Sequence, residues 1–368
     1  MTSPAGGIVG KAMTVLGPVD PDELGVTLMH EHLFIDLRAF HPPHARRVTS
    51  PGRSEPVLVS DDFPASDLLT WEADLELASL RQTADLKPLA DNWVLNDERL
   101  AIEEAREVSL AGGRTIVDLT SRGLKRDPEA LRRVSVATGL NVVMGSGWYQ
   151  KVFHPVDMDR RTVEELTKET VRDIIDGVGD TGIRAGIVGE VGVNGGPITP
   201  NEVKSIRSAA RASRLTGAAL NFHEAGQGLE KMRTLDVAEQ EGADLGRVVI
   251  SHCDKIASDM GLMLALLERG VTLEFDSGGR TSALTPSVTT DVVQTIPALI
   301  EAGHLDGVVI SQDVCTKINL KRFGGMGYSW VLETLVPRLL QRGLTEGQIR
   351  TMLVETPKRL LTFAEPRG

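Results

Sequence analysis

The segment 26–33 contains the triplet His30-Glu31-His32, whose residue types and spacing suit metal chemistry. The apolar residues before it favour a short strand, on which side chains two positions apart point to the same face. His30 and His32 can therefore converge on one point, and two imidazoles supply half of a transition-metal site. Taken alone, the pair is equally compatible with two separately hydrogen-bonded histidines. Ligands from later strands would decide between these interpretations.

Four later segments of predicted strand also end in a histidine or an acidic residue. Glu190, His223, His252 and Asp313 close the segments 184–190, 218–223, 247–252 and 307–313. The interior of a strand barrel is normally filled by branched apolar side chains, and burying an unpaired charge is costly. Any one of these residues could be a solvated loop residue, but six such strand-end positions together favour a common site.

Strand and helix patterns alternate along the chain, which predicts parallel β/α units and an α/β fold. With the His30 strand and the segments 115–120, 141–145 and 271–276, eight strands are expected, the number that closes a (β/α)8 TIM barrel. Active sites of this fold lie at the C-terminal ends of the strands. Helices are predicted at 128–138, 163–175, 201–215, 229–241, 261–268, 288–302, 329–341, 345–354 and 357–363.

We expect a single barrel domain over residues 1–368, because no second domain or low-complexity linker is visible. Residues 8–16 predict an N-terminal hairpin. A long irregular insertion, rich in Pro, Ser and Arg, covers about 38–64 and contains His41 and His44, which we interpret as loop residues. Residues 65–111 are expected to be mostly helical.

Composition narrows the classes of partner. The chain has 368 residues, 41% of them hydrophobic, and a net charge of −11, which argues against nucleic acid or an anionic membrane as the main partner. No signal peptide and no apolar run of transmembrane length is visible. Cys253 and Cys315 are too few for a disulfide framework. These features predict a cytoplasmic protein that acts on a small molecule.

The six strand-end residues offer imidazole and carboxylate donors without thiolate, which suits zinc, manganese, cobalt or iron. Six ligands exceed the needs of one catalytic ion, but they suit two ions roughly 3.5–4 Å apart that share a bridging carboxylate and a bridging hydroxide. We expect Glu190 to bridge, His30, His32 and Asp313 to hold one ion, and His223 and His252 to hold the other. Asp313 would also orient the hydroxide and accept its proton, while one ion polarises the C=O or P=O of the substrate.

The motifs GVTLMHEHLF, RAGIVGEVG, NFHEAG, VISHCD and ISQDV stand in this order and spacing, and the chain resembles the phosphotriesterase-like family of the amidohydrolase superfamily from about residue 15 to 363. The resemblance implies a (β/α)8 barrel with a binuclear centre, usually of zinc, that hydrolyses esters, lactones, amides or phosphotriesters. It also implies a homodimer by analogy.

Two departures narrow the resemblance. Organophosphate-degrading members bridge their metals with a carboxylated lysine on the fourth strand, whereas this chain has Gly189-Glu190, as in the glutamate-bridged branch of phosphotriesterase-related and phosphotriesterase homology proteins. If the lysine aligns with Gly189, a small backbone shift is needed for Glu190 to reach the metals. Ser277 follows Asp276 where those members carry a proton-relaying histidine. Members of the glutamate-bridged branch include hydrolases of N-acyl amino sulfonates, and the run 317–329 is similar to this branch.

The substrate pocket is less well defined. Trp148 and Tyr149 follow the third strand and suit a pocket wall, with packing at the rim as the alternative. Lys317, Arg322 and Arg280 could bind an anionic tail of the substrate, or be surface cations on glycine-rich loops.

Asp276 and Asp254 could orient His252 or His223, since metal-bound imidazoles usually need a hydrogen-bond partner. The leading hypothesis is a metal-dependent hydrolase of a carboxylic ester, lactone or amide. The alternatives are a phosphotriesterase or phospho-sugar lactonase and, more remotely, a catalytically silent binding protein on the same scaffold.

Overall fold

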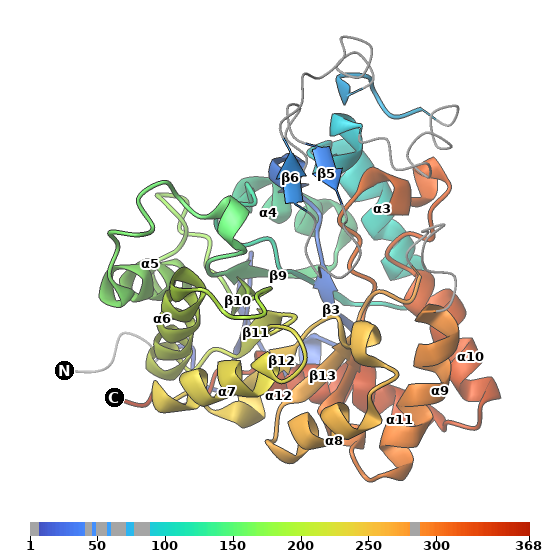
Figure 1. Cartoon of the computed structure of the whole chain (residues 1–368). Coiled ribbons are helices and arrows are strands. Elements are labelled where there is room, and N and C mark those ends of the chain that lie inside the picture. Colours follow the sequence, from blue (N-terminus) through green and yellow to red (C-terminus); the bar gives the residue numbers. More distant parts are fainter. Residues whose placement is uncertain (1–6, 41–45, 49–56, 60–70, 77–88, 280–287) are drawn as a thin grey trace.

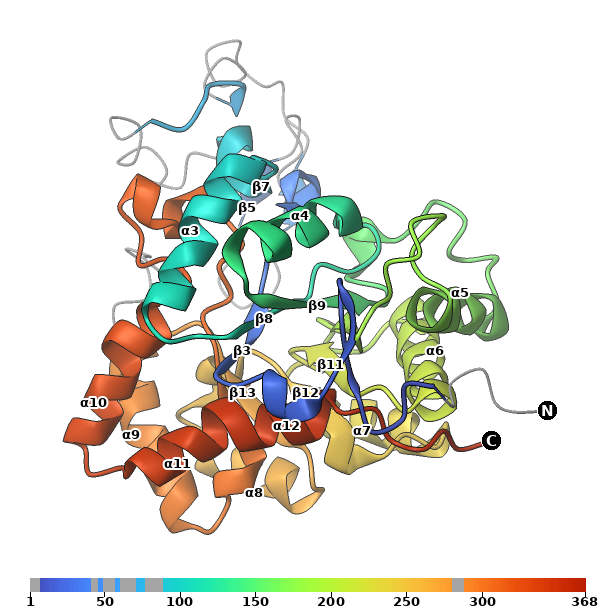
Figure 2. The same cartoon turned by 180° about the vertical axis from the view of Figure 1, so that it is seen from behind.

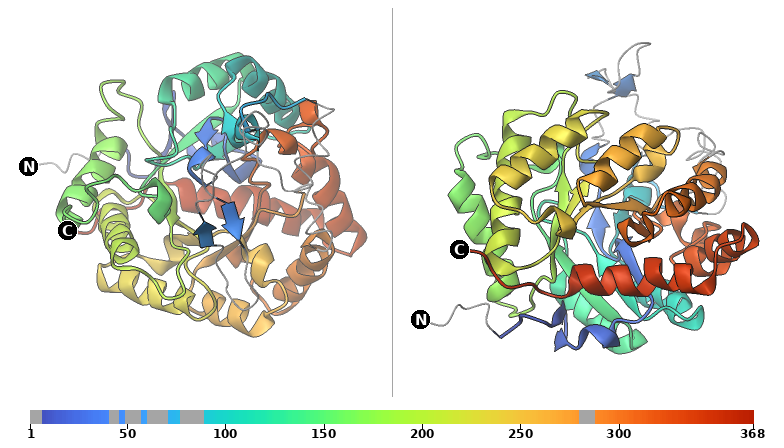
Figure 3. Two further views of the ribbon diagram at one scale, coloured as in Figure 1. Left: turned by 45° about the horizontal axis from the view of Figure 1, so that its top comes forward. Right: turned by 90° about the horizontal axis from the view of Figure 1, so that it is seen from below.

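A sheet of eight parallel strands forms the centre of the computed structural model, which describes residues 7–40, 46–48, 57–59, 71–76, 89–279 and 288–368. Helices surround this sheet on its outside, so that the molecule forms a ring of helices around a nearly closed barrel (Figures 1 and 3). The strands are β3 (Thr27–Glu31), β8 (Thr115–Asp118), β9 (Asn141–Ser146), β10 (Ile187–Gly192), β11 (Leu220–His223), β12 (Val248–Ile250), β13 (Thr272–Phe275) and β14 (Val308–Ile310). The predicted (β/α)8 barrel is confirmed.

The strands pair in the order β14-β13-β12-β11-β10-β9-β8-β3, so that β3 and β14 face each other across the seam of the barrel. Two backbone hydrogen bonds join them just beyond the strand ends. The amide of Asp313 donates to the carbonyl of His30 at 3.0 Å, and the amide of His32 donates to the carbonyl of Val314 at 3.2 Å. The seam therefore brings the first and the last of the predicted metal ligands together.

The outer helices begin at side chains that cap their free amide groups. Asp127 caps α4, and Thr162 and Thr199 form capping boxes with Glu165 and Glu202 at the starts of α5 and α6. The helices are α3 (Glu98–Leu110), α4 (Pro128–Thr138), α5 (Val163–Ile175), α6 (Pro200–Thr216), α7 (Glu230–Gln240), α8 (Met260–Glu268), α9 (Val288–Glu301), α10 (Val336–Gln341), α11 (Glu346–Arg350) and α12 (Thr356–Leu361), with π-helical segments at Val331–Leu335 and Thr351–Glu355.

The buried residues of the strands alternate between two apolar layers. Val249 and Val309 pack inside the barrel, whereas their neighbours Val248 and Val308 belong to the layer between strands and helices. Leu360 of α12 joins the inner layer, and α12 lies across the N-terminal ends of the strands (Figure 2). The inside of the barrel is therefore apolar at the N-terminal end.

Polar residues replace the apolar ones further along the same faces. Asn221, Ser251 and Ser311 stand two residues after inner apolar positions, and Glu274 occupies the equivalent place on β13. Ser251 donates to Glu274 at 2.8 Å and accepts a hydrogen bond from Asn221 at 2.9 Å. This fully buried polar layer lies directly beneath the C-terminal ends of the strands.

The segments outside the barrel differ in part from the sequence prediction. The N-terminal hairpin forms between β1 (Ala12–Thr14) and β2 (Gly17–Val19). The insertion at 38–64 contains an antiparallel pair, β5 (Arg46–Val48) and β6 (Val57–Val59), which stands clear of the ring of helices (Figure 3). The expected helical stretch 65–111 was wrong for 89–95, where a 3-10 turn at Ala90–Trp93 leads into β7 (Val94–Leu95), paired with β4 (Ile35–Asp36). His41 and His44 lie outside the described residues.

None of the helices in the described ranges combines the length and the apolar character that crossing a bilayer requires.

Candidate metal centre and cavity

Side chains at the C-terminal ends of the strands continue the inward-facing pattern of the barrel. His223, Asp276 and Asp313 each follow a member of the polar layer by two residues. They therefore point into the same space above that layer. All six residues that the sequence singled out, His30, His32, Glu190, His223, His252 and Asp313, are buried and meet there.

His30 and His32 direct their Nε2 atoms into this space because their Nδ1 atoms are held from behind. His30 Nδ1 lies 3.0 Å from Asp276 Oδ2 and 3.1 Å from Ser251 Oγ. His32 Nδ1 lies 2.9 Å from Thr120 Oγ1, which is a contact with the end of the neighbouring strand β8. A metal-binding imidazole needs such a partner on its other nitrogen to fix its orientation.

Glu190 reaches the centre because the strand is irregular. Ile187 belongs to the inner layer, so a regular strand would turn Gly189 inward and Glu190 outward. The pairing of β10 with β11 shifts register between Val188 and Val191, and this shift supplies the backbone displacement that the sequence required. Glu190 Oε1 lies 3.5 Å from His30 Nε2.

The other side of Glu190 faces His223 and His252. The same oxygen, Oε1, lies 3.2 Å from His252 Nε2 and also contacts His223 Nδ1. His252 Nε2 and His223 Nδ1 are themselves 2.8 Å apart. Glu190 thus stands between two pairs of imidazoles, as a bridging carboxylate would.

Asp313 is held by the backbone around it. Its own φ of 52° is in the left-handed region that non-glycine residues rarely adopt. The amides of Gln312 and Val314 on either side both donate to the carboxylate of Glu31 at 2.9 Å. Asp313 Oδ1 then lies 3.3 Å from His32 Nε2. Glu31, which points away from the cluster, clamps the turn that aims Asp313 into it.

A metal fits this donor set. His30 Nε2 is fully buried and has no hydrogen-bond partner among the described residues. Such an orphaned acceptor or donor is costly unless something else satisfies it. Ligand atoms of His30, Glu190 and His252 lie within 4.8 Å of one another, and so do those of His30, His32 and Asp313. The two groups share His30, so that the donors form one continuous cluster.

The ionisation states also suit metal binding. Burial, reinforced by His252, lowers the pKa of His223 to about 4, so its imidazole is neutral at pH 7 and has a lone pair to offer. Burial would raise the pKa of Glu190, but the imidazoles of His223 and His30 outweigh it and hold that pKa well below its usual range. Glu190 is therefore an ionised carboxylate.

Asp276 connects both halves of the cluster. Its Oδ1 accepts a hydrogen bond from His252 Nδ1 at 2.8 Å, while its Oδ2 faces His30. Asp254 in turn accepts hydrogen bonds from the amides of Asp276 and Ser277 at 2.8 and 3.1 Å. Ser277, at the place of the family's relay histidine, donates its hydroxyl to Asp276 at 3.2 Å. Asp276 thus contacts the imidazoles directly, and Asp254 holds the backbone of Asp276 from behind.

A cavity of about 310 Å³ opens onto the cluster. Its volume is at the small end of the usual range for ligand sites, which suits a small molecule. Loops after β3, β9, β11 and β12 contribute to its walls. Besides the cluster, the described residues that line it are Ile35, Leu37, Phe40, Trp93, Tyr149, Gln150, Asn194, Glu224, Lys255 and Cys315.

The predicted substrate residues occupy different places. Tyr149 lines the cavity, with its hydroxyl 3.1 Å from His223 Nδ1. Trp148 is not among the described residues that line it, and the guanidinium groups of Arg122 and Arg161 lie 5.5 and 5.2 Å from the centre of its ring, which fits the alternative of packing at the rim.

Two of the three predicted cations, Lys317 and Arg322, are not among the described residues that line the cavity. Lys317 forms an ion pair with Asp91 outside its walls. Arg322 is exposed and is also absent from the cavity lining. Arg280 lies outside the described residues. A contact of Lys317 or Arg322 with substrate therefore stays a prediction, and in this structure Lys317 is engaged by Asp91.

Sequence reasoning overlooked several residues around the cluster. Thr120, Ser251 and Glu274 support the imidazoles from beneath, and Glu31 holds the Asp313 turn. The inward position of Ser251 and Glu274 could have been read from the period-two pattern of their strands. Lys255 was also overlooked. It lies three residues after His252 and lines the cavity.

Comparison with known proteins agrees with this geometry. The model of the phosphotriesterase family matches residues 10–361, and the chain belongs to this family. An N-acetyltaurine hydrolase from Danio rerio is 33% identical over 96% of this chain and 98% of its own length. The resemblance inferred from the sequence is confirmed, and the chain is a hydrolase of this family.

Two solved structures share the fold and more than a quarter of the sequence. A resiniferatoxin-binding protein from Rhodobacter sphaeroides has a TM-score of 0.85 and 35% identity, over 96% of this chain and 95% of that one. A phosphotriesterase homology protein from Escherichia coli, with phosphate in its active site, has a TM-score of 0.74 and 27% identity, over 92% of this chain and 99% of that one.

Proposed function

We propose that this member of the phosphotriesterase family hydrolyses the amide bond of small N-acylated amines, and that N-acetyltaurine is the first substrate to test. The observation that carries the proposal is the convergence of six buried ligand residues at the base of a cavity of about 310 Å³. The N-acetyltaurine hydrolase from Danio rerio, similar over nearly the whole length of both chains, supports the choice of an amide.

We assign the six ligands to two divalent ions. His30, His32 and Asp313 would hold one ion, His223 and His252 the other, and Glu190 both. The 3.3 Å between His32 Nε2 and Asp313 Oδ1, and the 2.8 Å between His252 Nε2 and His223 Nδ1, support these two groups. Such a pair of ions lowers the pKa of bound water and polarises the substrate carbonyl. We propose zinc, because zinc takes imidazole and carboxylate ligands readily.

Asp313 is the residue that we assign to proton transfer. Its carboxylate lines the cavity beside His32, so it can take the proton of the water that adds to the carbonyl carbon. When the C–N bond breaks, Asp313 returns this proton to the departing amine nitrogen. One water is consumed, and a carboxylic acid and a free amine leave the site.

The walls of the cavity orient the substrate. Phe40 and Tyr149 pack edge to face with ring centroids 6.4 Å apart, and with Trp93 they offer an apolar surface to the acyl group. The hydroxyl of Tyr149 points toward His223 and is placed to hydrogen-bond a substrate oxygen. The cluster is almost completely buried, so water reaches it from the cavity side.

A panel of substrates tests the proposal. Metal-loaded protein is assayed with N-acetyltaurine, N-acetyl amino acids, an aryl ester, lactones and a phosphotriester. We expect the N-acyl amines to have the highest kcat/KM. A phosphotriester or lactone that reacts ten times faster than every amide would overturn the assignment in favour of the phosphotriesterase or phospho-sugar lactonase alternative.

We also propose the cytoplasm as the location, because the two cysteines suit a reducing compartment.

A further inference from the structure

The charged residues at the mouth of the cavity are unevenly distributed. Among the described residues that line it, Lys255 is the only lysine or arginine. Its side chain is half exposed. It forms an ion pair with Glu224, whose side chain is much less exposed, at 18%. Glu224 Oε1 also lies 3.7 Å from His223 Nε2. One carboxylate therefore links the ammonium group to a proposed metal ligand.

The backbone on both sides of this ion pair is firmly held. Buried Lys231 donates to the carbonyls of Glu224 and Gly226, so that the loop after β11 is tied to α7. Glu224 itself has a φ of 59° in the left-handed region. Such a conformation persists where its surroundings hold it, and it fixes the direction in which the Glu224 carboxylate leaves the backbone.

Lys255 stands on a similarly anchored turn. It belongs to the 3-10 helix Cys253–Ile256, and its amide donates to the carbonyl of His252 at 3.1 Å. Asp254, which precedes Lys255 in the same 3-10 helix, accepts hydrogen bonds from the two amides that follow β13. The backbone at Lys255 is therefore fixed, while its half-exposed side chain lines the cavity.

The opposite wall is apolar. In the eight-stranded ring, β3 stands across from β11, and the segment after β3 contributes Ile35, Leu37 and Phe40 to the cavity. A substrate whose carbonyl lies over the metal cluster thus has an apolar surface on one side and the Lys255–Glu224 pair on the other.

We propose that Lys255 recognises an anionic group, a sulfonate or carboxylate, on the amine side of the substrate, with Glu224 as the residue that positions it. This inference rests on the proposed amide hydrolysis. The ammonium group of lysine has three donors, so it can keep its bond to Glu224 and still donate to a substrate anion. The acyl group then lies against the apolar wall after β3. The short path from Lys255 through Glu224 to His223 limits the spacer between amide and anion to a few atoms.

Two substrates that differ only in the anion test this subsite. N-acetyltaurine and N-ethylacetamide share the acetyl amide and the two-carbon chain, but the second lacks the sulfonate. With Lys255→Met we expect the KM for N-acetyltaurine to rise about 10- to 100-fold, as for the loss of a charge-assisted hydrogen bond, while kcat/KM for N-ethylacetamide stays within twofold. Lys255→Arg should retain the preference for the anionic substrate.

Lys125→Met is the matched control, because Lys125 is an exposed lysine that pairs with Asp36 at 2.9 Å and does not line the cavity. It should leave the ratio of the two kcat/KM values unchanged. An equal loss on both substrates with Lys255→Met would assign Lys255 a structural role and overturn the proposal, and so would an unchanged KM for N-acetyltaurine.

A binding measurement separates failure of the subsite from failure of the proposed reaction. If metal-loaded wild-type protein hydrolyses neither amide, the proposed function fails, and N-acetyltaurine becomes a stable ligand for calorimetric titration. The subsite then predicts a Kd at least tenfold higher for Lys255→Met than for wild type. Equal Kd values, or no binding to wild type, would overturn the subsite as well.

Discussion

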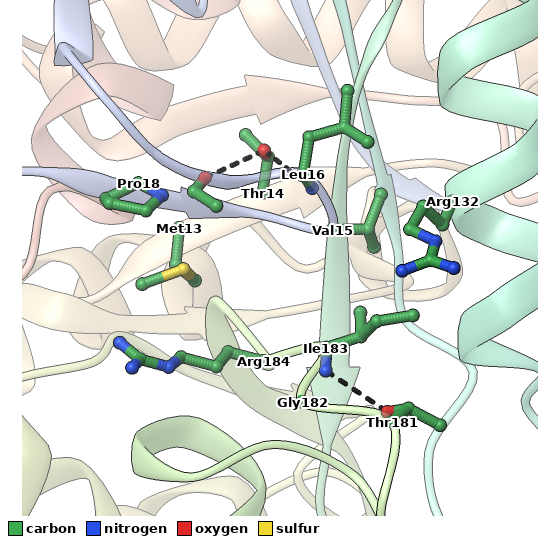
Figure 4. Close-up of a pocket in the computed structure, with 11 residues that line it drawn as sticks. Met13, Thr14, Val15, Leu16, Pro18, Arg132, Thr181, Gly182, Ile183 and Arg184 are labelled. Atoms are coloured by element: carbon green, nitrogen blue, oxygen red, sulfur yellow. Dashed lines mark hydrogen bonds between the residues drawn. The ribbon is translucent and has the colours of Figure 1, made fainter.

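The two ends of the barrel each contain a hollow, and the larger one has no metal-binding chemistry. At the N-terminal end, the β1–β2 hairpin and the loop Thr181–Arg184 border a cavity of about 460 Å³, against about 310 Å³ at the C-terminal end. The described residues that line the larger cavity include no histidine and no acidic residue. Figure 4 shows the guanidinium groups of Arg132 and Arg184 on separate sides of it rather than converging.

The difference shows that converging donors, rather than volume, identify the functional end. The hairpin at the larger cavity is joined to β9 by a backbone hydrogen bond, in which the amide of Val15 donates to the carbonyl of Val142 at 2.8 Å. Beneath the smaller cavity, the side chains of different strands meet, and His30 Nε2 has no hydrogen-bond partner among the described residues. This division between a stabilising face and a reactive face is general for TIM barrels.

The largest expected effect is at the proton-transfer residue. Asp313→Asn should lower kcat for N-acetyltaurine by about 10²- to 10⁴-fold, because the amide cannot take the proton of the attacking water. Steady-state kinetics and metal analysis on the same sample check this. A variant with full metal content and wild-type kcat would contradict the role of Asp313.

A smaller effect is expected one contact further from the substrate. Asp276→Asn removes a carboxylate that faces both His252 and His30, so metal affinity should fall about 10- to 100-fold. Competition with a chelator measures this affinity. If affinity is unchanged while the variant folds normally, the imidazoles are oriented by something other than Asp276.

A histidine bonded to the backbone of a cavity-wall residue, Tyr149, should make the stability of the protein depend on pH. His154 Nε2 donates to the carbonyl of Tyr149 at 2.7 Å, and burial lowers the pKa of His154 below its ordinary value of 6.5. As the pH falls below 6.5, the unfolded chain takes up this proton before the folded chain does, so His154 makes the free energy of unfolding decrease until the pH passes its folded pKa. Above pH 6.5 this contribution is absent.

His154→Gln should therefore reduce the loss of stability between neutral and mildly acidic pH. Urea unfolding of wild type and variant at pH 8 and pH 5.5 measures the difference. A steeper loss in the variant would mean that His154 is stabilised in its charged form.

The smallest effect is expected at the opposite end of the barrel. Arg184→Met changes a residue of the larger cavity and should leave kcat/KM for N-acetyltaurine within twofold of wild type, with a change in stability within about 0.5 kcal/mol. A tenfold loss of activity with intact metal content would show that the larger cavity also takes part in function.

The fold was predictable because its information is local. Apolar runs of strand length, each followed by a helical pattern, recur through the chain and correspond to β8 through β14. The ends of these strands also predicted where His223, His252 and Asp313 would meet. The antiparallel pair β5–β6 and the turn at Ala90–Trp93 escaped prediction because the surrounding sequence has no clear periodicity.

The details of the site depend on contacts that are distant in sequence. Regular alternation from Ile187 would point Glu190 outward, and only the register shift between β10 and β11 turns it inward. Lys317 follows Asp313 closely, yet it pairs with Asp91, 226 residues earlier in the chain. Lys255 was overlooked although it lies near His252 in the sequence. The sequence does not show how exposed its side chain is or which way that side chain points.

Reconstitution with metal tests the central claim most directly. Chelator-treated protein is titrated with zinc, and bound zinc and the rate of N-acetyltaurine hydrolysis are measured on each sample. The proposed centre predicts that bound zinc reaches two equivalents per chain and that the rate rises from near zero to its maximum over the same range. Full activity in protein that contains no bound metal would contradict a binuclear metal-dependent hydrolase.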